Sequence, residues 1–372
     1  MAFLGEEIKK LGFGMMRLPQ KDGKIDIEET KKMVDLYMKA GFTYFDTAFC
    51  YGGSEDATRQ ALVERYPRES FQLATKLSAW LNCNSKEDCI KQFETSLRQL
   101  GTDYFDFYLL HNLGPKRTHF YEEYGLWNWA FEQKAAGKIK HVGFSFHGGP
   151  EELEDILTKH PEAEFVQLQI NYADWENKDI ASRRCYEICR AHGKPVIVME
   201  PIKGGFLATP PENVVKVFKD AEPENSVASW AVRFCADLEG IITVLSGMST
   251  VQQVEDNLSY MKDFKHFDEG QKKVIEKAQE ELLKVPLVPC TDCNYCTKVC
   301  PVDIGIPGTF KCLNLYKLYG NVASAKVHLQ WNVDGPGKQR SEKCIKCGRC
   351  EMACPQHIDI RNQLSAATEL FK

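Results

Sequence analysis

The chain has 372 residues, of which 43% are hydrophobic, and a formal net charge of −5 at pH 7. This length allows a large domain followed by a small one, and no stretch reaches the roughly 18 apolar residues that a membrane-spanning helix needs. Residues 1–10 carry charges and no apolar run, so we expect a cytoplasmic protein without a secretory signal and without a membrane partner.

The chain alternates between apolar strand-like runs and helical stretches. The predicted strands are residues 11–16, 43–47, 71–75, 104–110, 141–145, 165–170, 195–199 and 241–245. The predicted helices are residues 28–40, 54–65, 85–99, 121–136, 150–159, 179–192, 226–236 and 250–258. Apolar strands separated by helices imply a parallel sheet. Eight such units predict an α/β fold, a closed (β/α)8 TIM barrel with its site at the carboxyl ends of the strands; a doubly wound open sheet is the alternative.

Ionisable side chains stand where three of these strands end. The runs finish at Asp46, Lys76 and His111, and Tyr51 follows Asp46 in a turn-rich stretch. Taken singly, each has an ordinary structural reading: a turn cap, a solvated lysine, a core histidine and a packed loop tyrosine. Because the strands of a parallel barrel end on one rim, all four together predict a shared catalytic site.

The four residue types suit acid catalysis at a carbonyl group. A tyrosine with its usual pKa near ~10 donates a proton poorly at neutral pH, and a buried ammonium beside it lowers that pKa. We expect Lys76 to provide this charge and Asp46 to orient Lys76. Tyr51 then acts as the general acid, while His111 donates a second hydrogen bond to the same oxygen.

These four residues, with the framing segments 45–48, 74–76 and 109–111, resemble the catalytic tetrad of the aldo-keto reductase superfamily. The resemblance extends over about residues 8–265. It implies an oxidoreductase that transfers hydride between NAD(P)H and an aldehyde or ketone, or in the reverse direction from an alcohol. The expected substrate is therefore a small carbonyl compound or alcohol.

The resemblance also implies a set of cofactor-binding residues. Ser145 and Gln167 would bond the nicotinamide carboxamide, the loop and helix after residue 245 would hold the pyrophosphate and adenosine, and Lys203 would reach a phosphate. For each position, ordinary strand-end or loop polarity is the alternative. The full set is Ser145, Gln167, Asn171, Lys203, Ser246, Gly247, Met248, Gln253 and Asn257.

The chain departs from better-known members of this superfamily in two places. Gly247 and Gln253 stand where basic residues would contact a 2′-phosphate, and Met199 stands where a tyrosine would stack on the nicotinamide. We therefore expect NADH to be at least competitive with NADPH, and a flavin stays open as an alternative cofactor. Four aromatic residues past strand ends are candidates to face the substrate, with simple packing as the alternative: Phe49, Trp80, Tyr172 and Trp175.

Two cysteine runs after residue 289 share the spacing C-x2-C-x2-C-x3-C-P, which is the run of bacterial two-cluster ferredoxins. In those proteins the fourth cysteine of each run ligates the other cluster. One predicted [4Fe–4S] cluster therefore takes Cys290, Cys293, Cys296 and Cys354, and the other takes Cys344, Cys347, Cys350 and Cys300. Structural zinc, which usually takes two separated pairs of ligands, is the rival.

The chain thus divides into a predicted aldo-keto reductase barrel, residues 1–284, and a small ferredoxin-like domain of mainly α-helical structure, residues 285–372. From residue 285 onward there are 11 Lys+Arg and 7 Asp+Glu. Because thiolate-ligated clusters are negatively charged, they offset this balance, and no nucleic-acid partner is expected.

Three functions stay open at this point. The first is a carbonyl reductase linked to the iron–sulfur domain. The second is a ferredoxin- or flavin-linked enzyme in which the barrel exchanges electrons with the clusters, and it would have a redox partner protein. The third is a redox-sensing binding module without catalysis.

Overall fold

The computed structural model describes residues 4–177 and 180–372, which form two compact units. The first unit contains the described residues up to Pro201 together with Ser229–Asp268, and the second contains Ile202–Ala228 and Glu269–Lys372. The predicted boundary between residues 284 and 285 stays a prediction. Residues 1–3 of the first predicted domain and residue 179, the start of a predicted helix, lie outside the described residues.

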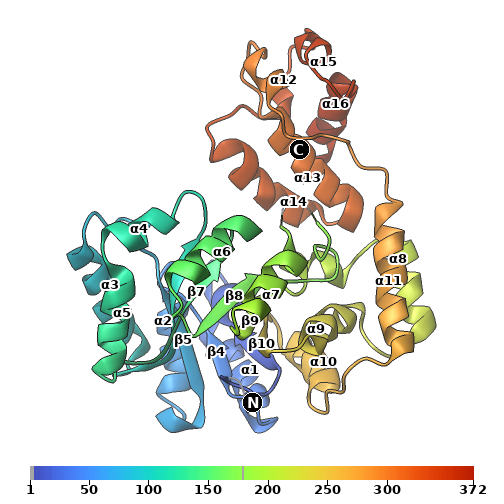
Figure 1. Ribbon diagram of the computed structural model, residues 1–372. Helices are drawn as coiled ribbons and strands as arrows, with labels where there is room; N and C mark the ends of the chain where they lie inside the picture. Colours follow the sequence, from blue (N-terminus) through green and yellow to red (C-terminus); the bar gives the residue numbers. More distant parts are fainter. Residues whose placement is uncertain (1–3, 178–179) are drawn as a thin grey trace. The chain divides into compact units, whose positions relative to one another are not determined.

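Eight parallel strands close into a barrel in the first unit (Figure 1). Their order around the barrel is β1, β10, β9, β8, β7, β6, β5, β4, and β4 pairs back to β1. This confirms the predicted TIM barrel and excludes the open sheet. The strands are Leu11–Gly14 (β1), Tyr44–Asp46 (β4), Gln72–Leu77 (β5), Phe105–Leu113 (β6), Ile139–Phe146 (β7), Phe165–Gln169 (β8), Val196–Met199 (β9) and Ile241–Ser246 (β10).

The strands bury both of their faces, which is why their sequences read as continuous apolar runs. Side chains from six strands meet in one buried group, which strands around a closed barrel can do only in its interior. This group contains Tyr44, Ala74, Phe107, Leu109, Phe165, Ile197, Ile242 and Leu245. The packed interior holds the strands rigidly, so that the polar residues at their carboxyl ends have fixed positions.

The helices of the first unit are Ile27–Lys39 (α1), Ser54–Thr58 (α2), Lys86–Leu100 (α3), Thr118–Glu123 (α4), Leu126–Ala135 (α5), Pro150–Lys159 (α6), Ser182–Ala191 (α7), Val227–Asp237 (α9) and Val251–Met261 (α10). Side-chain caps start several of them; for example, Ser85 accepts a hydrogen bond from the Asp88 N–H. The helix predicted over 121–136 is two helices, because Gly125 adopts a left-handed conformation (φ 60°) between α4 and α5. A hairpin of Gln20–Lys21 (β2) and Lys24–Ile25 (β3) was not predicted.

The second unit is helical apart from an isolated bridge between Ile304 and Gln339, among the residues that the structure describes. Its α-helices are Glu212–Ala221 (α8), Glu269–Leu283 (α11), Tyr295–Lys298 (α12), Ile306–Tyr319 (α13), Val322–Leu329 (α14), Arg349–Met352 (α15) and Ile360–Leu370 (α16). This confirms the helical character predicted for the C-terminal domain, whereas α8 and α11 were not predicted. A buried core that includes Ile304, Phe310 and Leu364 packs directly against the cysteine segments.

In the part of the chain that the structure describes, no helix combines the length and the apolar character needed to cross a membrane.

Candidate active site and cysteine-lined cavities

The four predicted catalytic residues lie at the ends of three neighbouring strands. Asp46 is the last residue of β4, Lys76 lies one residue before the end of β5, and His111 lies in the last third of β6. Tyr51 lies in the turn between β4 and α2, where its N–H donates to the Ala48 carbonyl oxygen and its own carbonyl oxygen accepts from Ser54. Since β4, β5 and β6 are adjacent and parallel, the structure brings all four to one rim of the barrel.

Asp46 and Lys76 form a buried ion pair. Lys76 Nζ lies 2.5 Å from Asp46 Oδ1 and 2.6 Å from the Thr47 carbonyl oxygen. The other carboxylate oxygen, Oδ2, accepts a hydrogen bond from Gln167 Nε2 at 3.1 Å. Burial raises the pKa of Asp46, and the Lys76 charge and the Gln167 hydrogen bond oppose this rise. Both oxygens of the carboxylate are thus held in fixed positions.

Tyr51 lies close to both the ion pair and the imidazole. Lys76 Nζ is 5.1 Å from the centre of the Tyr51 ring, and the Tyr51 and His111 ring centroids are 5.9 Å apart at an angle of 84°. The prediction that its pKa is lowered is wrong. Burial raises the pKa of Tyr51 well above 10, and Asp46, whose negative charge neutralises the neighbouring ammonium, adds to the rise.

His111 is almost fully buried and makes short contacts through one ring nitrogen. Its Nδ1 lies 2.9 Å from Ser78 Oγ and 3.5 Å from Cys50 Sγ. Its backbone oxygen accepts from Trp80 Nε1 at 3.2 Å and from the Tyr121 hydroxyl. Burial and the Lys76 charge lower the pKa of His111 well below 6.5, so the imidazole is neutral at pH 7.

Ser78 and Tyr121 are parts of this site that the sequence analysis missed. Ser78 follows β5 directly, two residues after Lys76, and this position on a strand that already carries a catalytic residue is a usable sequence signal. Tyr121 comes from α4 and leaves no such signal, because its contact with His111 depends on how that helix packs.

The two predicted carboxamide ligands are neighbours on adjacent strands. Ser145 of β7 and Gln167 of β8 are register partners. Ser145 Oγ accepts from the Asn112 N–H at 2.7 Å, which leaves the hydroxyl hydrogen for a second bond. Gln167 donates through Nε2 to Asp46 and has its carbonyl oxygen for an incoming donor. A hydroxyl donor beside an amide acceptor matches a carboxamide, which accepts at oxygen and donates at nitrogen.

Asn171 is engaged within the protein. Its amide nitrogen donates to Asp174 Oδ2 at 3.0 Å and to the Glu200 carbonyl oxygen at 3.2 Å, and its oxygen accepts from the Asp174 N–H at 2.9 Å. It fixes the loop after β8. Lys203 belongs to the short 3-10 segment Lys203–Ala208 of the second unit, and its phosphate contact stays a prediction.

The remaining predicted cofactor residues lie after β10 and in α10. Asn257 donates to Ser246 Oγ at 2.7 Å, which ties the helix to the end of the strand. Gly247 and Met248 continue the loop, where Met248 is fully buried. Gln253 bends its side chain back to accept the Ser249 N–H at 2.7 Å, while its own N–H donates to the Thr250 hydroxyl that caps α10.

The four aromatic candidates separate into two groups. Trp80 reaches the site, since its ring centroid is 6.0 Å from that of His111, and Phe49 lies partly exposed in the turn before Tyr51. Tyr172 and Trp175 pack on Phe234 of α9 instead, with ring centroids 6.4 and 5.4 Å apart. Tyr172 is only 1% exposed, so the packing alternative holds for it.

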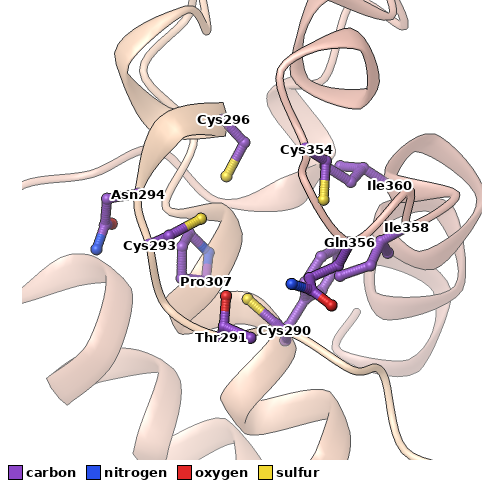
Figure 2. A pocket seen from close by; sticks show the side chains of 11 residues that line it. Cys290, Thr291, Cys293, Asn294, Cys296, Pro307, Cys354, Gln356, Ile358 and Ile360 are labelled. Carbon is purple, nitrogen blue, oxygen red and sulfur yellow. The ribbon is translucent and has the colours of Figure 1, made fainter.

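The eight predicted metal ligands line two small cavities in the second unit. Cys290, Cys293 and Cys296 surround the first together with Cys354, which reaches it from the other run, as Figure 2 shows. The second is lined by Cys344, Cys347, Cys350 and Cys300. The structure therefore places the fourth cysteine of each run with the first three of the other.

The crossed arrangement of the two runs favours a pair of [4Fe–4S] clusters over zinc. Structural zinc usually takes two separated pairs of ligands. In each cavity, three cysteines of one run meet the fourth cysteine of the other run, which is the ligand arrangement of two-cluster ferredoxins.

Comparisons with known proteins agree with both halves of this description. Residues 10–280 match the Aldo/keto reductase family, and residues 289–358 match the 4Fe-4S dicluster domain. An aldo-keto reductase of Mycolicibacterium smegmatis is 28% identical over 153 residues, which are 41% of this chain and 51% of that protein. The chain thus spans about half the length of this relative.

Solved structures share the barrel. An aldo-keto reductase of Bacillus halodurans in its holo form superposes with a TM-score of 0.60 at 24% identity, over 73% of this chain and 92% of that one. An aldo-keto reductase of Klebsiella pneumoniae in complex with NADPH gives a TM-score of 0.58 at 20% identity, over 74% and 93%. With its family match covering most of the chain, the protein belongs to the aldo/keto reductase family and carries a 4Fe-4S dicluster domain after its barrel.

Proposed function

We propose that the protein reduces an aldehyde or ketone, or oxidises the corresponding alcohol, with Tyr51 as the general acid. The observation that carries this proposal is the meeting of Asp46, Tyr51, Lys76 and His111 on one rim of the barrel. A phenol, a neutral imidazole and a buried ion pair provide two hydrogen-bond donors for one oxygen.

In this proposal NAD(P)H supplies the hydride to the carbonyl carbon. Tyr51 holds the proton that the carbonyl oxygen receives, because its raised pKa keeps the phenol protonated. His111 donates the second hydrogen bond to that oxygen. Lys76 lies beside the Tyr51 ring, and Asp46 holds Lys76 in place.

Ser145 and Gln167 are the proposed partners of the nicotinamide carboxamide. The Ser145 hydroxyl would donate to the carboxamide oxygen, and the Gln167 side-chain oxygen would accept from the carboxamide nitrogen. Because Gln167 also bonds Asp46, the same side chain would orient both the cofactor and the catalytic ion pair. The related fold solved with NADPH from Klebsiella pneumoniae is consistent with a dinucleotide in this barrel.

The test is anaerobic purification followed by a panel of small aldehydes and ketones with NADH and NADPH. We expect turnover that Tyr51→Phe lowers by at least about a hundredfold, in line with loss of a general acid. Tyr66→Phe is the matched control, because Tyr66 bonds Asp35 outside the site. Equal activity of Tyr51→Phe and the wild type would refute the mechanism, and absence of turnover across the panel would favour the redox-sensing binding module.

The two cavities support a second candidate, in which the barrel exchanges electrons with two [4Fe–4S] clusters. Cys293 and Cys347, one in each cavity, are exposed, so a cluster held there would lie near the surface and accessible to a redox partner. A hydride carries two electrons and a cluster takes one, so this candidate needs a mediator such as a flavin. Loss of the cluster absorbance on adding NADH or substrate, or a flavin spectrum in the purified protein, would support it; unchanged clusters during turnover would make them structural.

A further inference from the structure

The hydroxyl of Ser78 lies 2.9 Å from His111 Nδ1, and both side chains are buried. Ser78 has no exposed surface, and His111 is 6% exposed. Among the described residues, the other hydrogen-bonding contact of this nitrogen is the Cys50 thiol at 3.5 Å, and a thiol is a weak donor.

Ser78 is itself held by one side chain. Gln92 of α3 accepts the Ser78 N–H at 2.6 Å through Oε1 and donates to the Ser78 carbonyl oxygen at 3.3 Å through Nε2. Both polar groups of the Ser78 backbone are therefore fixed by one buried amide. These two hydrogen bonds leave Ser78 little freedom to move away from the imidazole.

Because His111 is neutral, its contact with Ser78 determines which ring nitrogen carries the hydrogen. A neutral imidazole carries one N–H, and its other nitrogen accepts. A substrate carbonyl oxygen can only accept, so His111 serves the reaction only with its hydrogen on Nε2. Nδ1 must then accept, and the Ser78 hydroxyl is the donor placed to fill it.

We propose that Ser78 is a positioning residue that sets the tautomer of His111, with Gln92 holding Ser78 in place. This role rests on the proposed function, because it acts through the hydrogen bond that His111 donates to the carbonyl oxygen. The Trp80 indole and the Tyr121 hydroxyl both bond the His111 backbone oxygen and fix the residue at its other end. The imidazole is thereby fixed in position by the backbone contacts and in tautomer by Ser78.

A double-mutant cycle tests the proposal. Ser78→Ala removes the donor, lets the proton move to Nδ1, and should lower kcat about tenfold while the KM for NAD(P)H stays within about twofold. In a His111→Ala background the same Ser78→Ala change should cost less than about twofold, because the residue through which Ser78 acts is absent. Equal losses in the two backgrounds would overturn the proposal.

Two further variants complete the design. Gln92→Met, which releases Ser78 but leaves its hydroxyl, should lower kcat less than Ser78→Ala and should likewise have no effect without His111. Thr30→Val deletes another fully buried hydroxyl, one that bonds the Asp26 carbonyl oxygen in α1, and should leave kcat unchanged. A loss in Thr30→Val as large as in Ser78→Ala would show that any buried hydroxyl gives the effect and would overturn the proposal.

The outcomes also separate this proposal from the proposed function. If Tyr51→Phe keeps full activity, the reductase mechanism itself is wrong. If Tyr51→Phe is inactive and the losses from Ser78→Ala and His111→Ala simply add, the mechanism stands and only the role of Ser78 is wrong.

Discussion

The side-chain amide of Gln167 donates to Oδ2 of Asp46 at 3.1 Å, although the two residues come from strands on opposite sides of the barrel. In the closed order, β8 and β4 are four strands apart in either direction. A bond between them crosses the mouth of the barrel. It joins the strands proposed for the cofactor to the strands that carry the catalytic residues.

We predict that Gln167→Leu lowers kcat/KM by about tenfold or more, since a hydrogen bond to a charged group contributes about 1.5–3 kcal/mol. The KM for NAD(P)H should rise as well, because the carboxamide loses an acceptor. Steady-state kinetics at several cofactor concentrations measures both. Gln60→Leu, which removes an amide that bonds the Asp56 carbonyl oxygen, is the control and should match the wild type.

Removing Lys76 should destabilise the barrel strongly. Lys76→Met leaves Asp46 buried without its counter-ion, and breaking such a pair costs about 3–5 kcal/mol. The double variant with Asp46→Asn should recover part of this loss, because no buried charge remains. Lys140→Met is the comparison: Lys140 also pairs with an aspartate, Asp106 at 2.8 Å, but its side chain is 52% exposed, so the loss should stay below about 1 kcal/mol.

Urea unfolding of the wild type and the three variants, followed by circular dichroism, measures these differences in stability. Similar midpoints for Lys76→Met and Lys140→Met would mean that the Asp46 carboxylate is neutral in the folded protein and needs no counter-ion.

The sequence was sufficient to predict the barrel because the strands are buried on both faces and therefore read as apolar runs, several of which have a polar residue at or near their end. Asp46, Lys76 and His111 stand at such ends, so topology alone brought them together. The two cysteine runs were equally informative, since ligand spacing is local in the chain. Helices α8 and α11 and the short hairpin of β2 and β3 were not predicted.

Properties that depend on packing were not predictable. The pKa of Tyr51 was expected to fall because Lys76 lies beside it, but burial and the charge of Asp46 reverse the direction. Gln92 and Ser78 are 14 residues apart, and nothing in this spacing predicts that the Gln92 side chain of α3 hydrogen-bonds the backbone of Ser78 at the end of β5. The sequence likewise does not show that the side chain of Gln253, a predicted cofactor residue, bends back to accept the Ser249 N–H.

The pH dependence of the reaction should be flat over a wide range. The pKa of Tyr51 is raised well above 10, so the phenol keeps its proton as the pH rises toward 10. The pKa of His111 is lowered well below 6.5, so the imidazole stays neutral as the pH falls through 6.5. Neither residue changes its protonation between about pH 6.5 and 10. We therefore expect that titration of Tyr51 or His111 causes no rise or fall of kcat/KM for carbonyl reduction between these pH values.

Profiles of the wild type and of His111→Gln provide the check. A limb in the wild type between about pH 7 and 9 that disappears in His111→Gln would show that the imidazole titrates there, against this prediction.

Cofactor preference should be weak. Gly247 and Gln253 offer no positive charge to a 2′-phosphate, so NADPH should exceed NADH in kcat/KM by less than about a hundredfold. Gln253→Arg should raise the preference for NADPH about tenfold, since arginine binds phosphate through paired charged hydrogen bonds. Gln252→Arg adds the same charge at the neighbouring exposed position of α10 and should change the ratio little. Equal shifts from both variants would point to a general charge effect rather than to contact at residue 253.

The crossed arrangement of the cysteines gives a prediction that separates the two cavities. Cys354→Ser should remove the cluster held by Cys290, Cys293 and Cys296, and the iron content should fall from about eight to about four atoms per chain. The exposed thiol of Cys293 should then react with iodoacetamide, while Cys347, still bound in the second cavity, stays protected. Cys300→Ser should give the reverse pattern.

Cys312→Ala is the control for these variants, because Cys312 is fully buried in the same unit and lines neither cavity. This variant should keep all of the iron, and both Cys293 and Cys347 should stay protected from iodoacetamide. Mass spectrometry of the alkylated peptides decides between the arrangements. If Cys354→Ser exposed Cys347 instead of Cys293, each run would hold its own cluster with four consecutive cysteines. The thiols would then have to move from where the structure places them, since Cys354 and Cys293 line the same cavity (Figure 2).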